Sequence, residues 1–398
     1  MLGTVARFTP SIEILVILNG NHLFRSPQAL RVSSSVSAPR VLHLIARMNM
    51  GGTATYLSNL MEGLASGEFP SQLVIGSVPR GEIEDPVVQR LGVIRIPELS
   101  REFSCRDLRA RRRFQQIVDV CAPEIIHSHT FKAGLIARTI KSDAKRVHTF
   151  HGHHLYDPEF SKVKVSILNG LERSLAKKSD RLVSVGNRVE EELLEVNVGR
   201  RDQYFSIPPG ITPLQLGVRD EVLARLNLQT TKPKVVWLGR FTEVKRPDRV
   251  IEIAKTIPEC DFIMAGGGEL ERTLASSIPS NLFMVGWQKK EEMWAVADLA
   301  LCTSDSEGMP LSLIEAQMSG VPVVSTDVGS VSEIVEDGIT GKLAPKDSRK
   351  LADAIREVVQ NISKGSEMSR AAKVRATRLF DVSVMVKAHE DLYRQMLG

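Results

Sequence analysis

The chain has 398 residues, of which 42% are hydrophobic and 25% charged, and a formal net charge of +5. One hydrophobic core seldom serves so long a chain, so we expect two domains, and the mild positive charge indicates solubility as readily as an anionic partner. The four cysteines form no Cys-x-x-Cys pair, which argues against a disulfide framework or a zinc ribbon, and the lack of a run of about 18 apolar residues argues against a membrane span.

Residues 1–40 are interpreted as an N-terminal extension. Their apolar run, residues 14–18, follows Glu13 and makes a poor signal peptide, and the serine-rich stretch at 32–39 is typical of a linker. With reduced thiols and no membrane span, we expect a cytoplasmic protein.

From residue 41, strand-like apolar runs alternate with longer amphipathic segments, which predicts an α/β protein with parallel sheets covered by helices. We expect strands at residues 41–46, 73–75, 125–127, 146–149, 181–185, 234–238, 261–265, 282–285, 299–302 and 321–325. We expect helices at 53–64, 168–177, 247–255, 269–276 and 290–297. Pro208, Pro209 and Gly210 suit a domain junction, so we place the lobes at residues 41–208 and 209–380.

A further helix is expected to begin near Pro310, because proline suits the first turn, and to end at Gly320. Glu307 precedes this helix and Glu315 lies one turn within it. The free N–H groups and the positive end of the helix dipole between the two glutamates offer a site for a diphosphate, with a carboxylate on each side to hold hydroxyls. The backbone groups at this site belong to Gly308, Met309, Pro310 and Leu311, of which proline has no N–H.

Arg240 and Lys245 follow an expected strand, at the edge of an open sheet where ligands bind, and can neutralise a diphosphate. Two such residues in isolation are usually exposed cations of a surface loop, but their place between a strand and a helix favours the phosphate role. Glycine turns after strands bring bare backbone close to a ligand. Those turns contain Gly51 and Gly52, Gly239, and Gly267. The sequence has no G-x-G-x-x-G fingerprint, which argues against a dinucleotide-dependent dehydrogenase. It has no P-loop either.

The first half is rich in histidine, at His127, His129, His148, His151, His153 and His154. Such spacing could bind zinc, yet no acidic or thiolate partner set lies nearby, and we expect no metal. An arginine run follows residue 100, at Arg101, Arg106, Arg109, Arg111, Arg112 and Arg113. A solvated helix face is the simpler interpretation, and contact with anionic lipid headgroups or a lipid diphosphate is the alternative. Nucleic acid is not expected, because no aromatic residues interleave the arginines.

The two glutamates have the E-x7-E spacing, and other segments accompany them in a fixed order. These segments are Gly51-Gly52, the histidine segments at 126–129 and 149–152, the Gly-Arg and Lys at 239–245, and the glycines at 329–341. Over residues 41–345 the chain thus resembles glycosyltransferase family 4, the retaining enzymes of GT-B type. The resemblance implies two Rossmann-like, doubly wound domains that face each other across a cleft, and a last helix at 381–398 that crosses back to the first domain.

The resemblance also implies the reaction, which is retaining transfer of a hexosyl or N-acetylhexosaminyl group from a UDP- or GDP-sugar. The acceptor would be a glycan or a lipid-linked saccharide, as in cell-surface polysaccharide biosynthesis. Arg240 and Lys245 would stabilise the leaving diphosphate, and a phosphate oxygen would accept the acceptor's proton. Glu307 would bind sugar hydroxyls, Glu315 the ribose, and His151 the donor sugar near the reacting carbon.

Family 4 enzymes generally need no metal, and the lack of an Asp-x-Asp argues against the metal-dependent GT-A class. The family often has an acidic residue soon after the Gly-Gly turn, where this chain has Thr53-Ala54-Thr55. The resemblance therefore does not identify the residues that bind the acceptor. Two alternatives are a sugar-nucleotide epimerase of GT-B fold and a noncatalytic sugar-nucleotide-binding or glycan-binding subunit. The expected location is the cytoplasm, with peripheral contact at the inner, anionic membrane face as an option.

Overall fold

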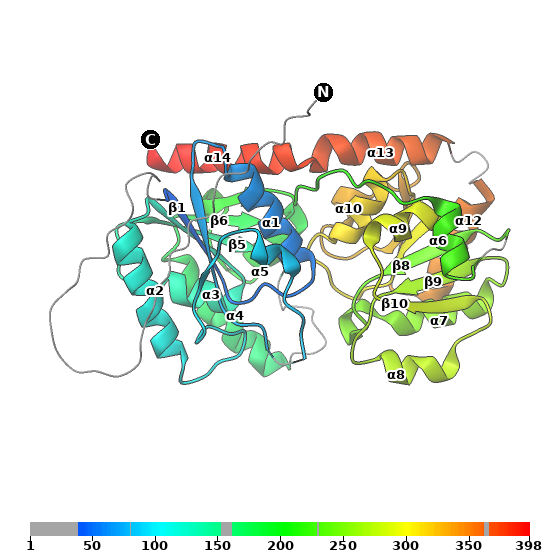
Figure 1. The fold of residues 1–398 in the computed structure, drawn as a ribbon, viewed down its shortest axis with the longest axis horizontal. Helices are drawn as coiled ribbons and strands as arrows, with labels where there is room; N and C mark the ends of the chain where they lie inside the picture. The colour runs from blue at the N-terminus through cyan, green and yellow to red at the C-terminus, as the bar shows by residue number, and fades with distance from the viewer. Residues whose placement is uncertain (1–38, 80, 153–160, 229–230, 362–365) are drawn as a thin grey trace, which may run out of the picture.

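The computed structural model describes residues 39–79, 81–152, 161–228, 231–361 and 366–398. The apolar run at 14–18, nearly all of the expected linker, and His153 and His154 lie outside the described residues. The described chain forms two lobes, each built on a parallel sheet with helices on both faces (Figure 1). None of the described helices is both long enough and apolar enough to cross a membrane.

The first lobe contains a seven-stranded sheet of order β3-β2-β1-β4-β5-β6-β7. Its strands are β1 (Val41–Ile45), β2 (Ser71–Ile75), β3 (Ile94–Arg95), β4 (Ile125–His129), β5 (Lys145–Phe150), β6 (Arg181–Ser184) and β7 (Tyr204–Ser206). Its helices are α1 (Gly52–Leu64), α2 (Asp107–Cys121), α3 (Phe131–Ala137), α4 (Lys162–Ala176) and α5 (Asn187–Glu195). Strands β1 and β4 are buried along their whole length, as expected for parallel strands covered on both faces.

The second lobe contains a six-stranded sheet of order β10-β9-β8-β11-β12-β13. Its strands are β8 (Lys234–Leu238), β9 (Asp261–Ala265), β10 (Leu282–Gly286), β11 (Leu299–Cys302), β12 (Val323–Thr326) and β13 (Gly341–Ala344). Its helices are α6 (Arg219–Arg225), α7 (Pro247–Thr256), α8 (Glu271–Leu274), α9 (Lys290–Val296), α10 (Leu311–Met318), α11 (Val331–Ile334), α12 (Ser348–Asn361) and α13 (Ser366–Phe380). The expected α/β class and the paired doubly wound sheets of a GT-B fold are confirmed.

Several expected bounds differ from the structure. The expected helix at 168–177 begins earlier, at Lys162, because the Ser161 side chain accepts the N–H of Lys164 and caps the first turn. The expected helix at 269–276 is a single short turn, α8, that continues as a 3-10 turn. The edge strands β3, β7 and β13 were not expected from the sequence, because they have two to four residues each and carry little periodicity.

In both sheets the order in which successive strands are added reverses near the middle. The order reverses between β1 and β4 in the first sheet and between β8 and β11 in the second. At such a switch point the loops leave the carboxyl ends of neighbouring strands in opposite directions, and ligands bind in the crevice between them. The fold therefore predicts that ligand-binding residues follow β1, β4, β8 and β11.

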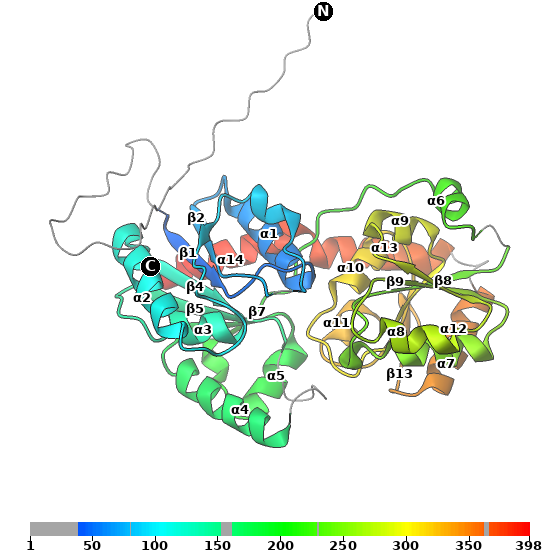
Figure 2. The ribbon, with the colours of Figure 1, turned by 60° about the horizontal axis from the view of Figure 1, so that its bottom comes forward.

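The chain crosses between the lobes twice, and the two crossings are joined to each other. Ile211 N–H donates to Phe380 O at 2.7 Å, and Val382 N–H donates to Ile211 O at 3.2 Å. The second crossing leads from α13, which packs on α10 of the second lobe, to α14 (Val382–Leu397), which packs on α1 of the first lobe. Figures 1 and 2 show these two helices running end to end beside both lobes. The domain boundaries themselves stay predictions.

Buried polar groups connect α14 to the first sheet. Tyr393 Oη lies 2.7 Å from His127 Nδ1, and Tyr56 Oη lies 3.0 Å from His389 Nε2. His389 Nδ1 also lies 2.8 Å from Met385 O, which can only accept, so Nδ1 carries the proton and Tyr56 donates to Nε2. These bonds give the last helix a specific position over the sheet that apolar packing alone would not give.

Helix α14 approaches α1 closely at a glycine. A Cβ on Gly63 would lie 2.2 Å from Val386 Cγ2, whereas a Cβ on Gly170 of α4 would meet nothing within 4 Å. We expect Gly63→Ala to lower the free energy of unfolding by about 1–3 kcal/mol, because the added methyl overpacks the interface. The matched control, Gly170→Ala, should raise it by about 0.5–1 kcal/mol. Urea unfolding of both variants measures the difference, and equal shifts in the same direction would contradict the close packing.

Buried neutral histidines predict a loss of stability in mild acid. Burial lowers the pKa of His43 to about 3 and that of His389 to about 4, from 6.5. Below pH 6.5 the unfolded chain binds protons that the folded chain does not, so the free energy of unfolding should fall from about pH 6.5 towards pH 4. Removing one such group, as in His389→Gln, should reduce the slope by about one proton. Urea unfolding at several pH values tests this, and an unchanged slope would mean that His389 is already protonated in the folded protein.

Candidate active site

A cleft of about 1270 Å³ lies between the lobes and is lined by residues of both. Its walls include the turn after β1, the end of β5, the turn after β8 and the segment between β11 and α10. The predicted site residues that line it are Gly51, Gly52, His151, Gly239, Arg240, Lys245, Glu307, Gly308, Met309, Pro310, Leu311 and Glu315. Residues up to 264 positions apart in sequence, from Gly51 to Glu315, are thus brought into one site.

Gly267 is the predicted residue that the structure does not place on the cleft wall. Its neighbour Gly266 lines the cleft instead, with φ of +138° and a backbone so close to Gly239 that a Cβ would lie 1.9 Å from the Gly239 carbonyl oxygen. A Cβ on Gly267 would lie 2.8 Å from Trp287 Nε1. The glycine turn therefore brings the ends of β8 and β9 together and leaves room for Trp287.

Glu307 is held by donors of the second lobe. Lys245 Nζ donates to its Oε1 at 2.5 Å, and Ser304 Oγ donates to the same oxygen at 2.5 Å. The neighbouring Asp305 binds Arg246 and Arg249 instead, so the two acids have separate partners. Glu307 is therefore an oriented carboxylate in the cleft rather than a solvated loop acid.

Arg240 is an exposed cation of the cleft wall, and it has no ion-pair partner among the residues that the structure describes. Its charge acts on Arg47 of the opposite lobe. Burial, the nearby charge of Arg101 and that of Arg240 lower the pKa of Arg47, while its ion pair with Glu82 acts in the opposite direction. Positive charge thus converges on the cleft from both lobes.

The loop that precedes α10 contacts the first lobe through its backbone. Helix α10 begins at Leu311, and Pro310 is its N-cap residue with ψ of 116°, one position before the expected first turn. A Cβ on Gly308 would lie 2.2 Å from the carbonyl oxygen of His151 and 3.2 Å from Gly152 Cα. Glycine at 308 therefore permits the loop before the helix to lie directly against the end of β5.

Glu315 is a buried carboxylate rather than an exposed helix-face residue. Lys290 Nζ donates to its Oε1 at 2.6 Å. Burial raises the pKa of Glu315, and the positive charge of Lys290 acts against that rise. A carboxylate held by one lysine in this way keeps acceptor capacity for hydroxyl groups in the cleft.

His151 faces this site from the first lobe. Its Nε2 lies 3.2 Å from His129 Nδ1. Its ring packs edge-to-face against the Tyr56 ring, with 4.7 Å between the two ring centroids. Burial lowers the pKa of His151 to about 3, so the imidazole is neutral and has one N–H donor and one acceptor.

Several residues line the cleft that were not expected from the sequence, namely Arg47, Tyr56, Lys132, Trp287 and Lys290. Trp287 comes directly after β10, at the same sheet edge as Arg240, and that position was the available signal. Of the arginine run, Arg101 lines the cleft, while Arg109, Arg111 and Arg112 lie on the exposed face of α2.

Two protein families match this chain, one over each lobe. The family "Glycosyltransferase Family 4" matches residues 50–213, and the family "Glycosyl transferases group 1" matches residues 218–375. An Escherichia coli protein named UDP-Gal:alpha-D-GlcNAc-diphosphoundecaprenol alpha-1,3-galactosyltransferase is 24% identical over 92% of this chain and 99% of its own length. A Klebsiella pneumoniae protein of the cps region, described as uncharacterized, is 26% identical over 89% of this chain and 99% of its own length.

Solved structures share the fold. Sucrose-phosphate synthase from Thermosynechococcus elongatus superposes with a TM-score of 0.76 at 20% identity, over 90% of this chain and 99% of its own. Anabaena HepE, solved in complex with UDP-glucose, gives 0.74 at 18% identity, over 89% and 99%. Since the two family matches together span most of the chain and the sheets have GT-B neighbours, the chain belongs to the family 4, group 1 glycosyltransferases.

Proposed function

We propose that this chain moves a sugar from a UDP-sugar, with GDP-sugar as the alternative donor, to a lipid-linked saccharide with retention of anomeric configuration. The observation that carries the proposal is the grouping of Arg240, the Lys245–Glu307 pair and the start of α10 on one wall of the cleft. The E. coli relative is named for a UDP-galactose donor, and HepE was solved with UDP-glucose. Those names support uridine as the first base to test.

The geometry suggests how the donor is held. The diphosphate lies where Arg240, Lys245 and the free N–H groups before α10 can bind its oxygens. Glu315 accepts from ribose hydroxyls and Glu307 from sugar hydroxyls. As the bond from the sugar carbon to the phosphate oxygen breaks, these cations and N–H groups stabilise the charge that develops on the diphosphate.

Transfer then needs no nucleophile from the protein. The acceptor oxygen forms its bond to the sugar carbon on the face that the phosphate leaves, and its proton passes to a phosphate oxygen. The lobes supply orientation, with the sugar between His151 and Glu307. We propose that no metal is required, because Arg240 and Lys245 provide the positive charge that an ion would otherwise provide.

The first lobe suits an anionic acceptor. Arg47, Arg101 and Lys132 line the cleft there, and Lys132 is held by Asp107 and by the Glu102 carbonyl oxygen. The acceptor in the name of the E. coli relative contains a diphosphate on a long lipid. A lipid diphosphate is therefore the acceptor class that we propose, and Arg101, which has no acidic partner among the described residues, would bind its phosphates.

Exposed apolar side chains near the cleft suggest how such a lipid is reached. Val163, Ile167 and Leu171 lie four residues apart on α4, with 71%, 60% and 38% of their surfaces exposed. Lys164 and Leu168 of the same helix line the cleft. An apolar stripe beside lysines is typical of helices that lie on anionic membranes, so we propose peripheral contact through α4.

Lys245→Ala should lower kcat for sugar transfer by about 100-fold or more, the effect of removing one preorganised charge from a transition state. The unfolding midpoint should change little. The assay uses purified protein, a UDP-sugar, a short-chain saccharide diphosphate lipid and EDTA, with NMR to assign the anomer of the product. Lys255→Ala, at the exposed end of α7, is the control and should keep parental turnover. Equal turnover in the Lys245 variant and the parent would exclude a role of Lys245 in stabilising the leaving diphosphate. Conversion of the donor sugar without acceptor would indicate an epimerase.

Vesicle sedimentation tests the membrane contact. The parent should bind vesicles with about 30% anionic lipid and bind neutral vesicles much less, because lysines contribute about 1 kcal/mol each near an anionic surface. Val163→Ser with Ile167→Ser should weaken this binding while transfer to a short, water-soluble acceptor stays at the parental rate. Undiminished vesicle binding by the double variant would exclude α4 as the contact surface.

A further inference from the structure

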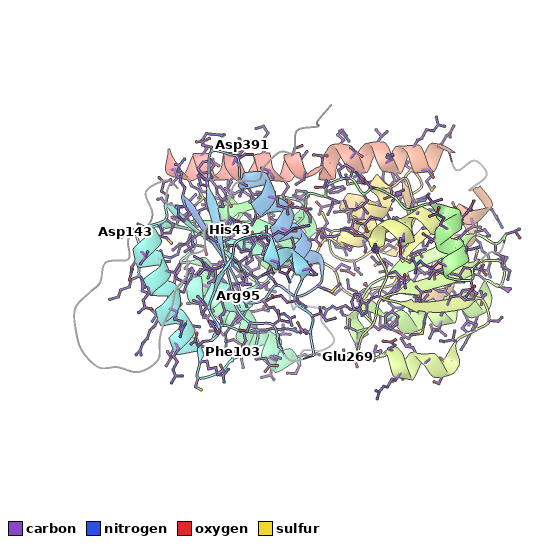
Figure 3. All side chains as sticks on the ribbon, viewed as in Figure 1. His43, Arg95, Phe103, Asp143, Glu269 and Asp391 are labelled. Atoms are coloured by element: carbon purple, nitrogen blue, oxygen red, sulfur yellow. The ribbon has the colours of Figure 1, made fainter. Side chains whose placement is uncertain are left out.

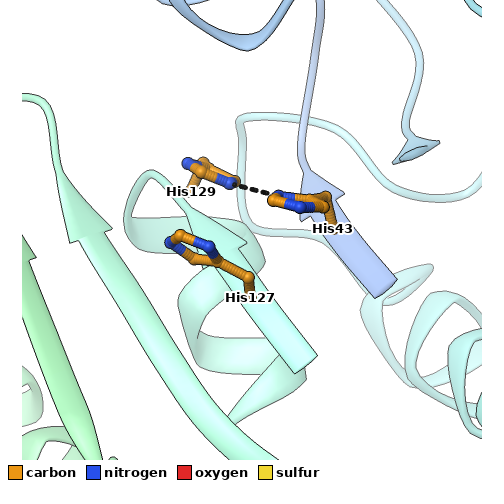
Figure 4. Close-up of side chains that lie close together, drawn as sticks. All are labelled: His43, His127 and His129. Carbon is orange, nitrogen blue, oxygen red and sulfur yellow. Dashed lines mark hydrogen bonds between the residues drawn. The ribbon is translucent and has the colours of Figure 1, made fainter. Parts of the chain in front are cut away.

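Three histidines meet inside the first lobe, and one of them was not expected from the sequence. His43 of β1 joins His127 and His129 of β4, so that one ring nitrogen of each lies within 4.8 Å of the others (Figure 4). Figure 3 shows His43 among the side chains of the lobe interior. All three side chains are fully buried.

The ring geometry does not suit a metal ion. The rings of His43 and His129 lie side by side, with 14° between their planes and 5.4 Å between their centroids. Their facing nitrogens, His43 Nδ1 and His129 Nε2, are 3.1 Å apart and bind each other, whereas an ion between two facing nitrogens would hold them about 4 Å apart. Both nitrogens of His127 are also within 2.7 Å of hydroxyl partners, Tyr393 Oη and Thr149 Oγ1.

The rings instead form a hydrogen-bonded chain that leads to the cleft. His43 Nδ1 lies 3.1 Å from His129 Nε2, and His129 Nδ1 lies 3.2 Å from His151 Nε2. His151 lines the cleft, where its Nδ1 is the ring nitrogen left for a ligand. The chain therefore connects the lobe interior to the site through a single buried ring, His129.

In a row of hydrogen-bonded neutral imidazoles, the tautomer of one ring determines the tautomer of the next. Burial lowers the pKa of His43 and His151 to about 3 and that of His129 well below its ordinary value. A neutral imidazole has one N–H and one lone pair, so His129 must accept from one neighbour if it donates to the other. Two settings of the chain are possible, and they give His151 opposite tautomers.

His43, at the interior end of the hydrogen-bonded histidines, favours one of these two arrangements of protons. His43 Nε2 is buried and has no hydrogen-bond partner among the described residues. Buried N–H groups without an acceptor are rarer than under-used acceptors, so this nitrogen should be the lone-pair side. His43 Nδ1–H then donates to His129, His129 Nδ1–H donates to His151 Nε2, and His151 keeps its proton on Nδ1.

We propose that His129, backed by His43, is a positioning residue that fixes His151 as an Nδ1–H donor towards an oxygen atom of the donor sugar. The part that concerns the sugar rests on the proposed function. The tautomer of His151 does not depend on the proposed function, because the hydrogen bonds that link His43, His129 and His151 involve no ligand.

The first test is the ¹⁵N spectrum of the histidine side chains in ligand-free protein, with His151 assigned by substitution. The parent should show His151 as the Nδ1–H tautomer. His129→Asn keeps an amide near the position of Nδ1 and should keep that tautomer, while His129→Leu should give the Nε2–H form or a mixture. An Nε2–H tautomer in the parent would overturn the proposal, and so would an unchanged His151 signal in His129→Leu. The parent spectrum decides even where a variant fails to fold.

The second test compares turnover. With a UDP-sugar, His129→Leu should lower kcat by about tenfold or more, as expected when a group that contacts the substrate is misaligned, and His129→Asn should recover most of it. His148→Asn is the matched control, because His148 is equally buried on β5 but binds Ser128 Oγ outside the chain. It should keep the parental kcat. Equal losses in His129→Asn, His129→Leu and His148→Asn would mean a merely structural role, whereas an inactive parent with the expected spectrum would count against the proposed function alone.

Discussion

The contact between Gly308 and the carbonyl oxygen of His151 is the constraint on which the site depends. It leaves no room for a Cβ, so the loop of the second lobe lies against the end of β5 in the first. The same loop holds Glu307 next to Lys245 and leads into α10, while the strand end holds His151. Behind the loop, a Cβ on Gly329 would lie 1.9 Å from the Glu307 carbonyl oxygen. Two glycines thus set the distance between the proposed sugar-binding groups of the lobes.

The last helix adds a second connection between the lobes. Helix α14 crosses to the first lobe, and its His389 binds Tyr56, whose ring lies against His151. Its Tyr393 binds His127 beside the histidine chain. The helix that joins the lobes therefore also packs against the residues that orient His151. We infer that separation of the lobes would disturb both the cleft and the support of His151.

Local sequence patterns predicted most of the central strands, part of the helices, and residues that line the second-lobe wall of the cleft. The glutamates, Arg240 and Lys245 follow strands or begin a helix, so their places could be predicted from residues a few positions away. His43 and His389 could not, because their partners lie 86 and 333 positions away and only the folded chain brings them together. The same holds for Lys290, which binds Glu315 from another helix. Gly266 lines the cleft and Gly267 does not, a difference that a run of three glycines in the sequence could not indicate.

We propose that the cleft binds a nucleoside diphosphate through protein cations and N–H groups. Calorimetric titration of the protein with UDP, GDP, ADP, dTDP and the matching nucleosides, all with EDTA present, tests it most directly. We expect one nucleoside diphosphate to bind and its nucleoside to bind at least about tenfold more weakly, a difference of about 1.4 kcal/mol. Equal affinity for nucleoside and diphosphate, or binding that requires a divalent ion, would contradict it.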